Sequence, residues 1–339
     1  MYLTVKIYMK PNENHIKKLL SYETTFKMEV KRIYEAFIKE KKIYEYPYKL
    51  VSNNISYNSK CLALLTAKDM YKKKKQNIPY HYSYSSIWNN SSYEINKNFL
   101  KLELGIDRNK EKLIIPIYFH EQPMNRIFSG KAMNMKIINR KDKWYANIYI
   151  ECKSPSKNSN KIMGIDIGVK VPAVCAIENN KIRFFGNGRE LRYLQRKFKS
   201  HIKEMQKNKQ YKKIESYEHK LSHILNYYDH KISKEIIDYA IRNDIGFIKM
   251  ENLTRINLKF NTYHNPNIYL WSYRRLQEYI DYKAKLNGIK VKYINPYNTS
   301  KVCPICGQIN HANDRYYECK CGFHGHRDAV AAMNILNAL

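Results

Sequence analysis

The sequence predicts a mixed α/β domain preceded by a small antiparallel β-barrel. In residues 99–152, short segments of alternating apolar and polar residues follow one another at a spacing typical of barrel strands. From residue 162 onward, strand-like and helix-like segments follow in the order β-β-β-α-β-α-β, and a helix ends the chain. The 339 residues, 44% of them hydrophobic, are enough for two or three domains with their own cores.

The N-terminal half combines a strand, helices and the barrel strands. Apolar and polar residues alternate over Leu3–Met9, which indicates a strand. Residues 13–42 have the apolar spacing of a helix, and residues 52–96, rich in Asn, Ser and Tyr, are expected to form a helix followed by a loop. We therefore assign residues 1–12 and 97–155 to the barrel and residues 13–96 to a helical insertion.

The C-terminal half follows a linker-like segment at residues 153–160. Three short strands come first, and the very basic residues 189–243 then have the length of a two-helix hairpin. A buried strand at 247–251, a helix at 271–287 and another strand precede the last helix. This order fits a ribonuclease-H-like α/β arrangement, which we assign to residues 160–298 and 327–339.

Four of the seven cysteines are spaced as C-x2-C, twelve residues and C-x-C. Four thiolates at this paired spacing match a tetrahedral structural Zn²⁺ site, which has no open position for catalysis. The glycines after the two pairs, Gly307 and Gly322, permit tight turns. Residues 299–326 are therefore assigned to a zinc ribbon inserted before the last helix. The proposed ligands are Cys303, Cys306, Cys319 and Cys321.

The shortened second pair leaves an alternative open. A histidine replaces one thiolate in some zinc sites, and His311, His324 and His326 all lie in this segment. The remaining cysteines are scattered and read as buried small hydrophobic residues: Cys61, Cys152 and Cys175.

Three carboxylates occupy positions that need an explanation. Asp166 lies in an apolar strand, where burial of an acid is costly unless it is paired or bound to metal, and Gly164 and Gly168 leave backbone room around it. Glu251 ends another apolar strand and Asp328 begins the last helix, although these two also fit a solvated strand end and a helix cap. If the three meet, their hard oxygens suit Mg²⁺ or Mn²⁺, and two such ions support phosphodiester hydrolysis.

Taken together, GIDIG, the Glu in MENL, the CPIC…CKCG ribbon and HRDAVAAMNI resemble the TnpB family of transposon-encoded, OrfB-type proteins. That family is related to the compact type V CRISPR effectors. The match covers about residues 160–339 with motifs in the same order, whereas the N-terminal half matches only in layout. Two features depart from the family pattern: Val330 stands where many members have Asn, and the second cysteine pair is shortened.

The resemblance implies an RNA-guided DNA endonuclease with a RuvC-type nuclease domain and a wedge-like barrel that carries a helical recognition insertion. By motif position it implies that Asp166, Glu251 and Asp328 are the catalytic, metal-binding acids and that the four ribbon cysteines hold zinc. It further implies a guide RNA and a double-stranded DNA target as partners.

The charge balance agrees with a polyanionic partner. Lys and Arg number 61 against 30 acids, a net charge of +31. The basic helices at 14–42 and 189–213 are candidates for the walls of a heteroduplex channel. Aromatic residues among them are expected either to stack on unpaired bases or to pack in the core: Tyr193, Phe198 and Tyr211.

The absence of a long apolar run and of a signal-peptide pattern favours a cytoplasmic protein with no membrane partner. The family resemblance implies that the cell is prokaryotic and that the protein acts at the nucleoid.

Three other functions fit parts of the sequence. A nuclease-inactive, RNA-guided DNA-binding regulator is expected to lack a carboxylate, and all three are present. A DNA-strand-transferring transposase also uses three acids on a ribonuclease-H fold, but a ribbon just before the last acid favours the TnpB arrangement. A CRISPR effector proper shares the motifs and differs in genomic context. The sequence specifies neither the guide nor the oligomeric state.

Overall fold

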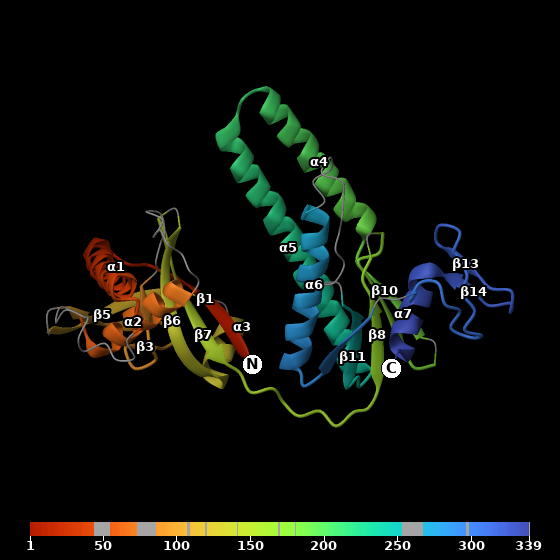
Figure 1. The fold of residues 1–339 in the computed structure, drawn as a ribbon, viewed down its shortest axis with the longest axis horizontal. Coiled ribbons are helices and arrows are strands. Elements are labelled where there is room, and N and C mark those ends of the chain that lie inside the picture. The colour runs from red at the N-terminus through yellow and green to blue at the C-terminus, as the bar shows by residue number, and fades with distance from the viewer. Residues whose placement is uncertain are drawn as a thin grey trace. The chain divides into compact units, whose positions relative to one another are not determined.

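The structure, a computed structural model, describes residues 1–43, 55–72, 86–106, 109–118, 121–140, 142–168, 170–179, 181–252, 267–295 and 298–338. The chain divides into two compact units, Met1–Lys153 and Ser154–Leu339, and each has its own sheet (Figure 1). The division falls within the linker-like segment that the sequence predicts at residues 153–160.

An antiparallel seven-stranded sheet, in the order β2-β6-β7-β1-β5-β4-β3, forms the first unit. The central strand β1 pairs with β7 along its whole length and with β5 at one end. Because no described pairing joins β2 to β3, the sheet is an open half-barrel where the sequence predicts a barrel. The strands are β1 Tyr2–Met9, β2 Ile87–Trp88, β3 Tyr93–Ile95, β4 Phe99–Ile106, β5 Asn109–Tyr118, β6 Lys131–Arg140 and β7 Lys143–Glu151.

Within the described residues of this unit, three helices accompany the sheet: α1 Glu13–Glu40, α2 Tyr57–Lys72 and α3 Glu121–Ser129. The predicted N-terminus of α1 is confirmed, with Asn12 as its capping residue. Buried apolar side chains, including Phe26, Ile33 and Ala63, pack α1 against α2.

Two features of this unit differ from the prediction. The loop expected after α2 contains β2 and β3, which extend the sheet at its two edges. The sequence pattern also missed α3, because Pro123 suggests a break. A proline is tolerated in the first turn of a helix, and Pro123 lies in that turn of α3.

The second unit is built on a five-stranded sheet in the order β10-β9-β8-β11-β12. β8, β9 and β10 form antiparallel hairpins, whereas β11 runs parallel to both β8 and β12. The predicted order of strands and helices is therefore observed. Since β8 and β11 are parallel, their carboxyl ends share one edge of the sheet. The strands are β8 Ile162–Asp166, β9 Ala173–Ile177, β10 Lys181–Phe185, β11 Phe247–Glu251 and β12 Lys290–Ile294.

Helices cover both faces of this sheet. One face is packed by α5 Tyr211–Arg242 and α6 Asn267–Leu286, whose Ile236 and Ile280 are fully buried against it. The other face is packed by α7 Arg327–Asn337. The helix α4 Gly188–Lys207 forms the predicted hairpin with α5, which extends away from the sheet (Figure 1).

The contact between α7 and β8 explains one glycine differently from the sequence. A Cβ atom at Gly164 would lie 2.4 Å from both the carbonyl oxygen of Ala332 and the backbone nitrogen of Leu336. Gly164 therefore permits close approach of α7 to the sheet, where the sequence suggested room around Asp166.

Residues 298–326 form the predicted small insertion, with the strands β13 Tyr316–Glu318 and β14 His324–His326 paired antiparallel. Within the described part of the chain, the helices are all too short or too polar to cross a membrane.

Candidate active site and metal centre

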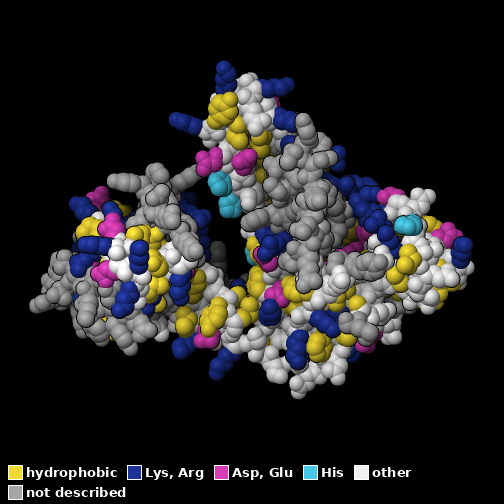
Figure 2. Space-filling view, viewed as in Figure 1, with side chains coloured by type: hydrophobic (Ala, Val, Ile, Leu, Met, Phe, Trp, Pro, Cys, Tyr) yellow, Lys and Arg dark blue, Asp and Glu magenta, His cyan; other side chains and the backbone are white. Residues whose placement is uncertain are grey.

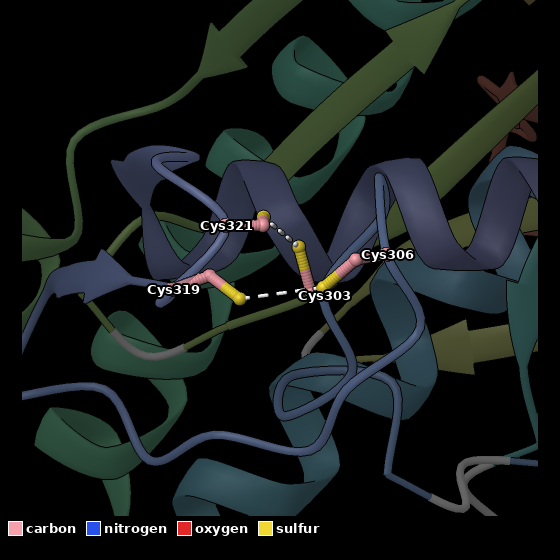
Figure 3. Close-up of side chains that lie close together, drawn as sticks. All are labelled: Cys303, Cys306, Cys319 and Cys321. Carbon is pink, nitrogen blue, oxygen red and sulfur yellow. Dashed lines mark hydrogen bonds between the residues drawn. The ribbon is translucent and has the colours of Figure 1, made fainter.

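The four ribbon cysteines converge on one point (Figure 3). Their sulfur atoms all lie within 4.8 Å of one another, with 3.7 Å between Cys303 and Cys321 and 3.4 Å between Cys306 and Cys319. Four thiolates bound tetrahedrally at about 2.3 Å from a zinc ion lie about 3.8 Å apart. The observed sulfur positions therefore fit a Zn²⁺ ion.

Tight turns place these sulfurs. Gly307 and Gly322 follow the two cysteine pairs with φ angles of +75° and +88°, a backbone conformation that favours glycine. Asn310 adds a hydrogen bond from its side-chain amide to the Cys319 sulfur, at 3.2 Å. The first cysteine of each pair, Cys303 and Cys319, is buried, so the site is built into the ribbon core.

The histidine alternative finds no support in the described residues. His326 caps α7, since its Nδ1 accepts a hydrogen bond from the Asp328 backbone N–H at 3.2 Å. His324 lies 3.4 Å from the Gly322 carbonyl oxygen, and His311 is exposed. None of the three joins the group of converging ligand atoms.

The fold places the three carboxylates close enough for their charges to interact. Asp166 ends β8 and Glu251 ends β11, and the register of these parallel strands makes the two residues neighbours. Asp328 lies in the first turn of α7. The pKa of Asp166 is raised to about 8, first by burial of its carboxyl group and then by the negative charges of Glu251 and Asp328.

Hydrogen bonds fix the position of Glu251, which is half-buried rather than a solvated strand end. The Thr299 hydroxyl donates to its carboxylate, and Gln277 donates to its backbone carbonyl at 2.7 Å. Burial raises the pKa of Glu251, and the hydrogen bond from Thr299 acts against that rise. Asn334 of α7 donates to the Thr299 carbonyl at 2.6 Å, so α7 also supports this contact.

An arginine that the sequence did not single out holds Asp328. The Nη1 atom of Arg315 lies 2.5 Å from each carboxylate oxygen of Asp328, whose side chain is buried. Asp328 is therefore an ion-paired side chain, while His326 caps the helix. Next to Arg315, Asp314 pairs with Lys170 at 2.7 Å, which joins the ribbon to the segment between β8 and β9. No spacing pattern in the sequence marks Arg315, because its partner lies across a hairpin.

The donor set at the sheet edge fits a hard divalent cation. Desolvation first, and then the negative charges of Glu251 and Asp328, raise the pKa of Asp166, and a bound cation would oppose that rise. Carboxylate oxygens are the ligands that Mg²⁺ and Mn²⁺ prefer. Within the described residues, these oxygens are less tightly gathered than the cysteine sulfurs.

The α4–α5 hairpin carries a basic surface. Figure 2 shows Lys and Arg side chains around its free end. Of the three aromatic residues considered from the sequence, Phe198 packs in the core against Tyr217, with 4.7 Å between ring centroids. Tyr193 and Tyr211 are 60% and 66% exposed. The exposed lysines near the tip are Lys203, Lys207, Lys209, Lys212 and Lys213.

Two family models match the chain. Residues 144–257 match the OrfB_IS605 family, described as a probable transposase, and residues 273–335 match the Cas12f1-like TNB domain. The second match contains the cysteine ribbon and Asp328, and the first contains Asp166 and Glu251.

Known relatives agree with these matches. The chain is 31% identical over 269 residues to the CRISPR-associated endodeoxyribonuclease Cas12f1 of Sulfoacidibacillus thermotolerans, covering 72% of this chain and 63% of that protein. It is 39% identical over 114 residues to a TnpB-like protein of Methanocaldococcus jannaschii, covering 32% of this chain and 40% of that protein. The chain thus spans less than two thirds of the length of these curated relatives.

The fold has a counterpart among solved structures. A cryo-EM structure titled as the Cas12f1–sgRNA–target DNA complex superimposes with a TM-score of 0.70 at 19% identity, covering 95% of this chain and 82% of that one. This likeness establishes the shared fold across both units. Independently of this structure, the family matches and the relatives support the resemblance to the TnpB-like family that the motifs carry.

Proposed function

We propose that this protein is a metal-dependent, RNA-guided DNA endonuclease encoded by a mobile element, with a RuvC-like active site. The observation that carries the proposal is that Asp166, Glu251 and Asp328, supplied by three separate elements, lie close enough for their charges to interact. The names of the relatives support it, since Cas12f1 is an endodeoxyribonuclease and its solved complex contains a guide RNA and target DNA.

In the proposed reaction Asp166, Glu251 and Asp328 would hold the two divalent cations that phosphodiester hydrolysis requires. Bound Mg²⁺ or Mn²⁺ would activate water and stabilise the leaving 3′ oxygen. Thr299 orients the Glu251 carboxylate, and Arg315 positions Asp328 from the ribbon side. Asp166 would contribute as the carboxylate anion, a form that a bound cation would favour by opposing the rise of its pKa.

The domain assignment follows from the same proposal. We assign a wedge-like role to residues 1–12 and 97–155, guide and target recognition to 13–96, nuclease chemistry to 160–298 and 327–339, and a structural zinc ribbon to 299–326. The proposed partners are a guide RNA and a double-stranded DNA target, met in the cytoplasm of a prokaryotic cell. The basic α4–α5 hairpin is the candidate surface for the heteroduplex backbone.

The decisive experiment starts from protein expressed together with its native flanking DNA. Any RNA that co-purifies is sequenced, and a matching duplex is incubated with the complex and Mg²⁺. We expect the wild type to cut and Asp166→Asn to lose at least a thousandfold in rate while retaining RNA and DNA binding. The matched control is Asp244→Asn, an exposed acid with φ of +53°, a conformation that asparagine tolerates.

The other outcomes separate the competing functions. Absence of bound RNA contradicts guided cleavage. Binding of RNA and DNA without cleavage by the wild type indicates the nuclease-inactive regulator. Joining of the DNA ends to a second duplex, instead of hydrolysis, indicates the strand-transferring transposase.

A further inference from the structure

A row of aromatic side chains crosses the unburied face of the first unit's sheet. Tyr8 in β1 pairs with Tyr118 in β5 on one side and with Tyr145 in β7 on the other. Ile138 in β6 pairs in turn with Tyr145. Since paired residues of neighbouring strands lie on the same face, these four side chains form one line, while residues such as Ile7 point into the core.

The tyrosines in this line are accessible. Tyr118 is 55% exposed, and Tyr8 and Tyr145 are half-buried, with 5.6 Å between their ring centroids and an angle of 54° between the rings. Cross-strand packing explains the contact between those two rings. It does not explain why a third ring, Tyr118, continues the row on the next strand.

Basic side chains accompany the rings. The Lys6 Nζ lies 3.8 Å from the centre of the Tyr145 ring, and the Lys10 Nζ lies 4.1 Å from that of Tyr118. Lysine has a long flexible stem, so each ammonium can leave its ring for a phosphate when a base takes its place. The same face of β6 and β7 adds three more cations: Lys136, Arg140 and Lys143.

Few acids oppose this charge. On the described parts of β1, β6 and β7, the acid on the unburied face is Glu151, at the far end of the strands from the three rings. The Tyr2 hydroxyl donates a hydrogen bond to its carboxylate at 3.3 Å. The pKa of Lys6 is lowered by partial burial and by the positive charge of Arg140, which shows that the cations act on one another. The face is therefore complementary to an anion.

A polar group lies beside the rings. Asn147 in β7 pairs with Lys6 on one side and Lys136 on the other. Its Oδ1 is shielded from solvent, and no group in the described part of the chain donates a hydrogen bond to it. A shielded acceptor without a donor is unfavourable, and a ligand with an N–H group would satisfy it.

We propose that this tyrosine platform, made of Tyr8, Tyr118 and Tyr145, binds unpaired nucleotides. Their bases stack on the rings, their phosphates meet the flanking lysines, and a base N–H donates to Asn147. Neighbouring strands lie about 4.8 Å apart, so three rings suit two or three successive bases. The platform extends the proposed function because it requires a nucleic-acid ligand, but it requires neither the metal site nor cleavage.

The test measures binding of the full chain, without divalent cations, to labelled ten-nucleotide probes of uridine RNA and thymidine DNA. About 300 mM salt weakens contacts made to phosphates alone. Valine suits a strand but lacks a ring, so Tyr8→Val with Tyr145→Val removes stacking while favouring the fold. Stacking lost at two rings is expected to raise the Kd at least tenfold. Replacing both by phenylalanine keeps the rings and is expected to leave the Kd within about twofold.

Controls and outcomes make the test decisive. Tyr316→Val removes an exposed tyrosine from β13 of the ribbon, outside the segments assigned to nucleic-acid recognition, and is expected to bind as wild type. If the valine pair raises the Kd for the RNA probe alone, the platform binds RNA. If it raises the Kd for the DNA probe alone, the platform binds DNA. The proposal is overturned if the valine pair binds both probes like wild type, or if the phenylalanine pair loses as much as the valine pair. The cleavage rate of Asp166→Asn does not affect probe binding by the platform variants. Failure of the platform proposal and failure of the proposed nuclease function are therefore distinguishable.

Discussion

At the scale of single residues, the environment of Asp166 lowers the stability of the folded chain near neutral pH. Asp166 is half-buried, and its pKa is raised from 3.8 to about 8, first by desolvation of its carboxyl group and then by the charges of two other acids. A raised pKa in the folded state means that the native protein holds a proton that the unfolded chain has already released. Between pH 3.8 and about 8, stability from this group therefore falls as the pH rises.

We expect the free energy of unfolding of the wild type, in buffer without Mg²⁺, to decrease with pH in this window by up to roughly 1.4 kcal/mol per pH unit from Asp166. Asp166→Asn removes that titration and should be the more stable protein near pH 7. Denaturant unfolding at several pH values measures both curves. Parallel curves for the two proteins would contradict a raised pKa of Asp166.

Arg315 is the residue whose role the structure adds. It pairs with both oxygens of the buried Asp328, and its removal leaves that carboxylate without its partner. Arg315→Gln is therefore expected to slow cleavage at least tenfold and to lower stability by about 1–3 kcal/mol. The exposed ribbon residue Lys320 gives the control Lys320→Gln. Equal cleavage rates for the two variants, measured over a range of Mg²⁺ concentrations, would refute a positioning role.

At the scale of elements, the ribbon and α7 act together. Asn334 of α7 donates to the carbonyls of Thr299 and Val302, and Val330 packs in the same cluster as Cys303. Loss of zinc should therefore disturb α7 and the carboxylate that it carries.

We expect Cys303→Ser to lose its zinc, measured as metal per chain, and to cut DNA poorly even with all three acids intact. Cys61→Ser, which changes a cysteine outside the cluster, should keep one zinc per chain and normal activity. Full zinc content in Cys303→Ser would mean that another side chain completes the site.

The elements also show what the sequence could predict. Strong period-two segments such as β1 and β7, and the long amphipathic helices, are predictable because their apolar residues repeat along the chain. The short strands β2 and β3 are not predictable, because two or three residues are too few to show an alternating pattern. They form strands because they pair with the edges of the sheet. Likewise, the sequence marks Asp166 as an unusual buried acid, but Arg315 acquires its role only through a tertiary contact.

At the scale of the whole molecule, the net charge of +31 predicts that binding of nucleic acid weakens as the salt concentration rises. Each phosphate contact on a single strand adds about 0.7 to the slope of log affinity against log salt. We expect the affinity for unstructured RNA to fall at least tenfold between 50 and 200 mM salt. Replacing the five tip lysines of the α4–α5 hairpin by glutamine should make the slope shallower. An unchanged slope would exclude this hairpin from the interface.

The close packing of α7 on β8 also determines how late in synthesis the proposed site can form. Asp328 follows Asp166 by 162 positions (328 minus 166), and Lys249 of β11 holds the far end of α7 through the Leu336 and Ala338 carbonyls. At about 5–20 residues per second, a ribosome needs roughly ten to thirty seconds to cover that distance. During this interval the nascent chain carries at most two of the three acids and cannot assemble the proposed site. A chain abandoned before the ribbon is complete would therefore be harmless to the DNA of its own cell.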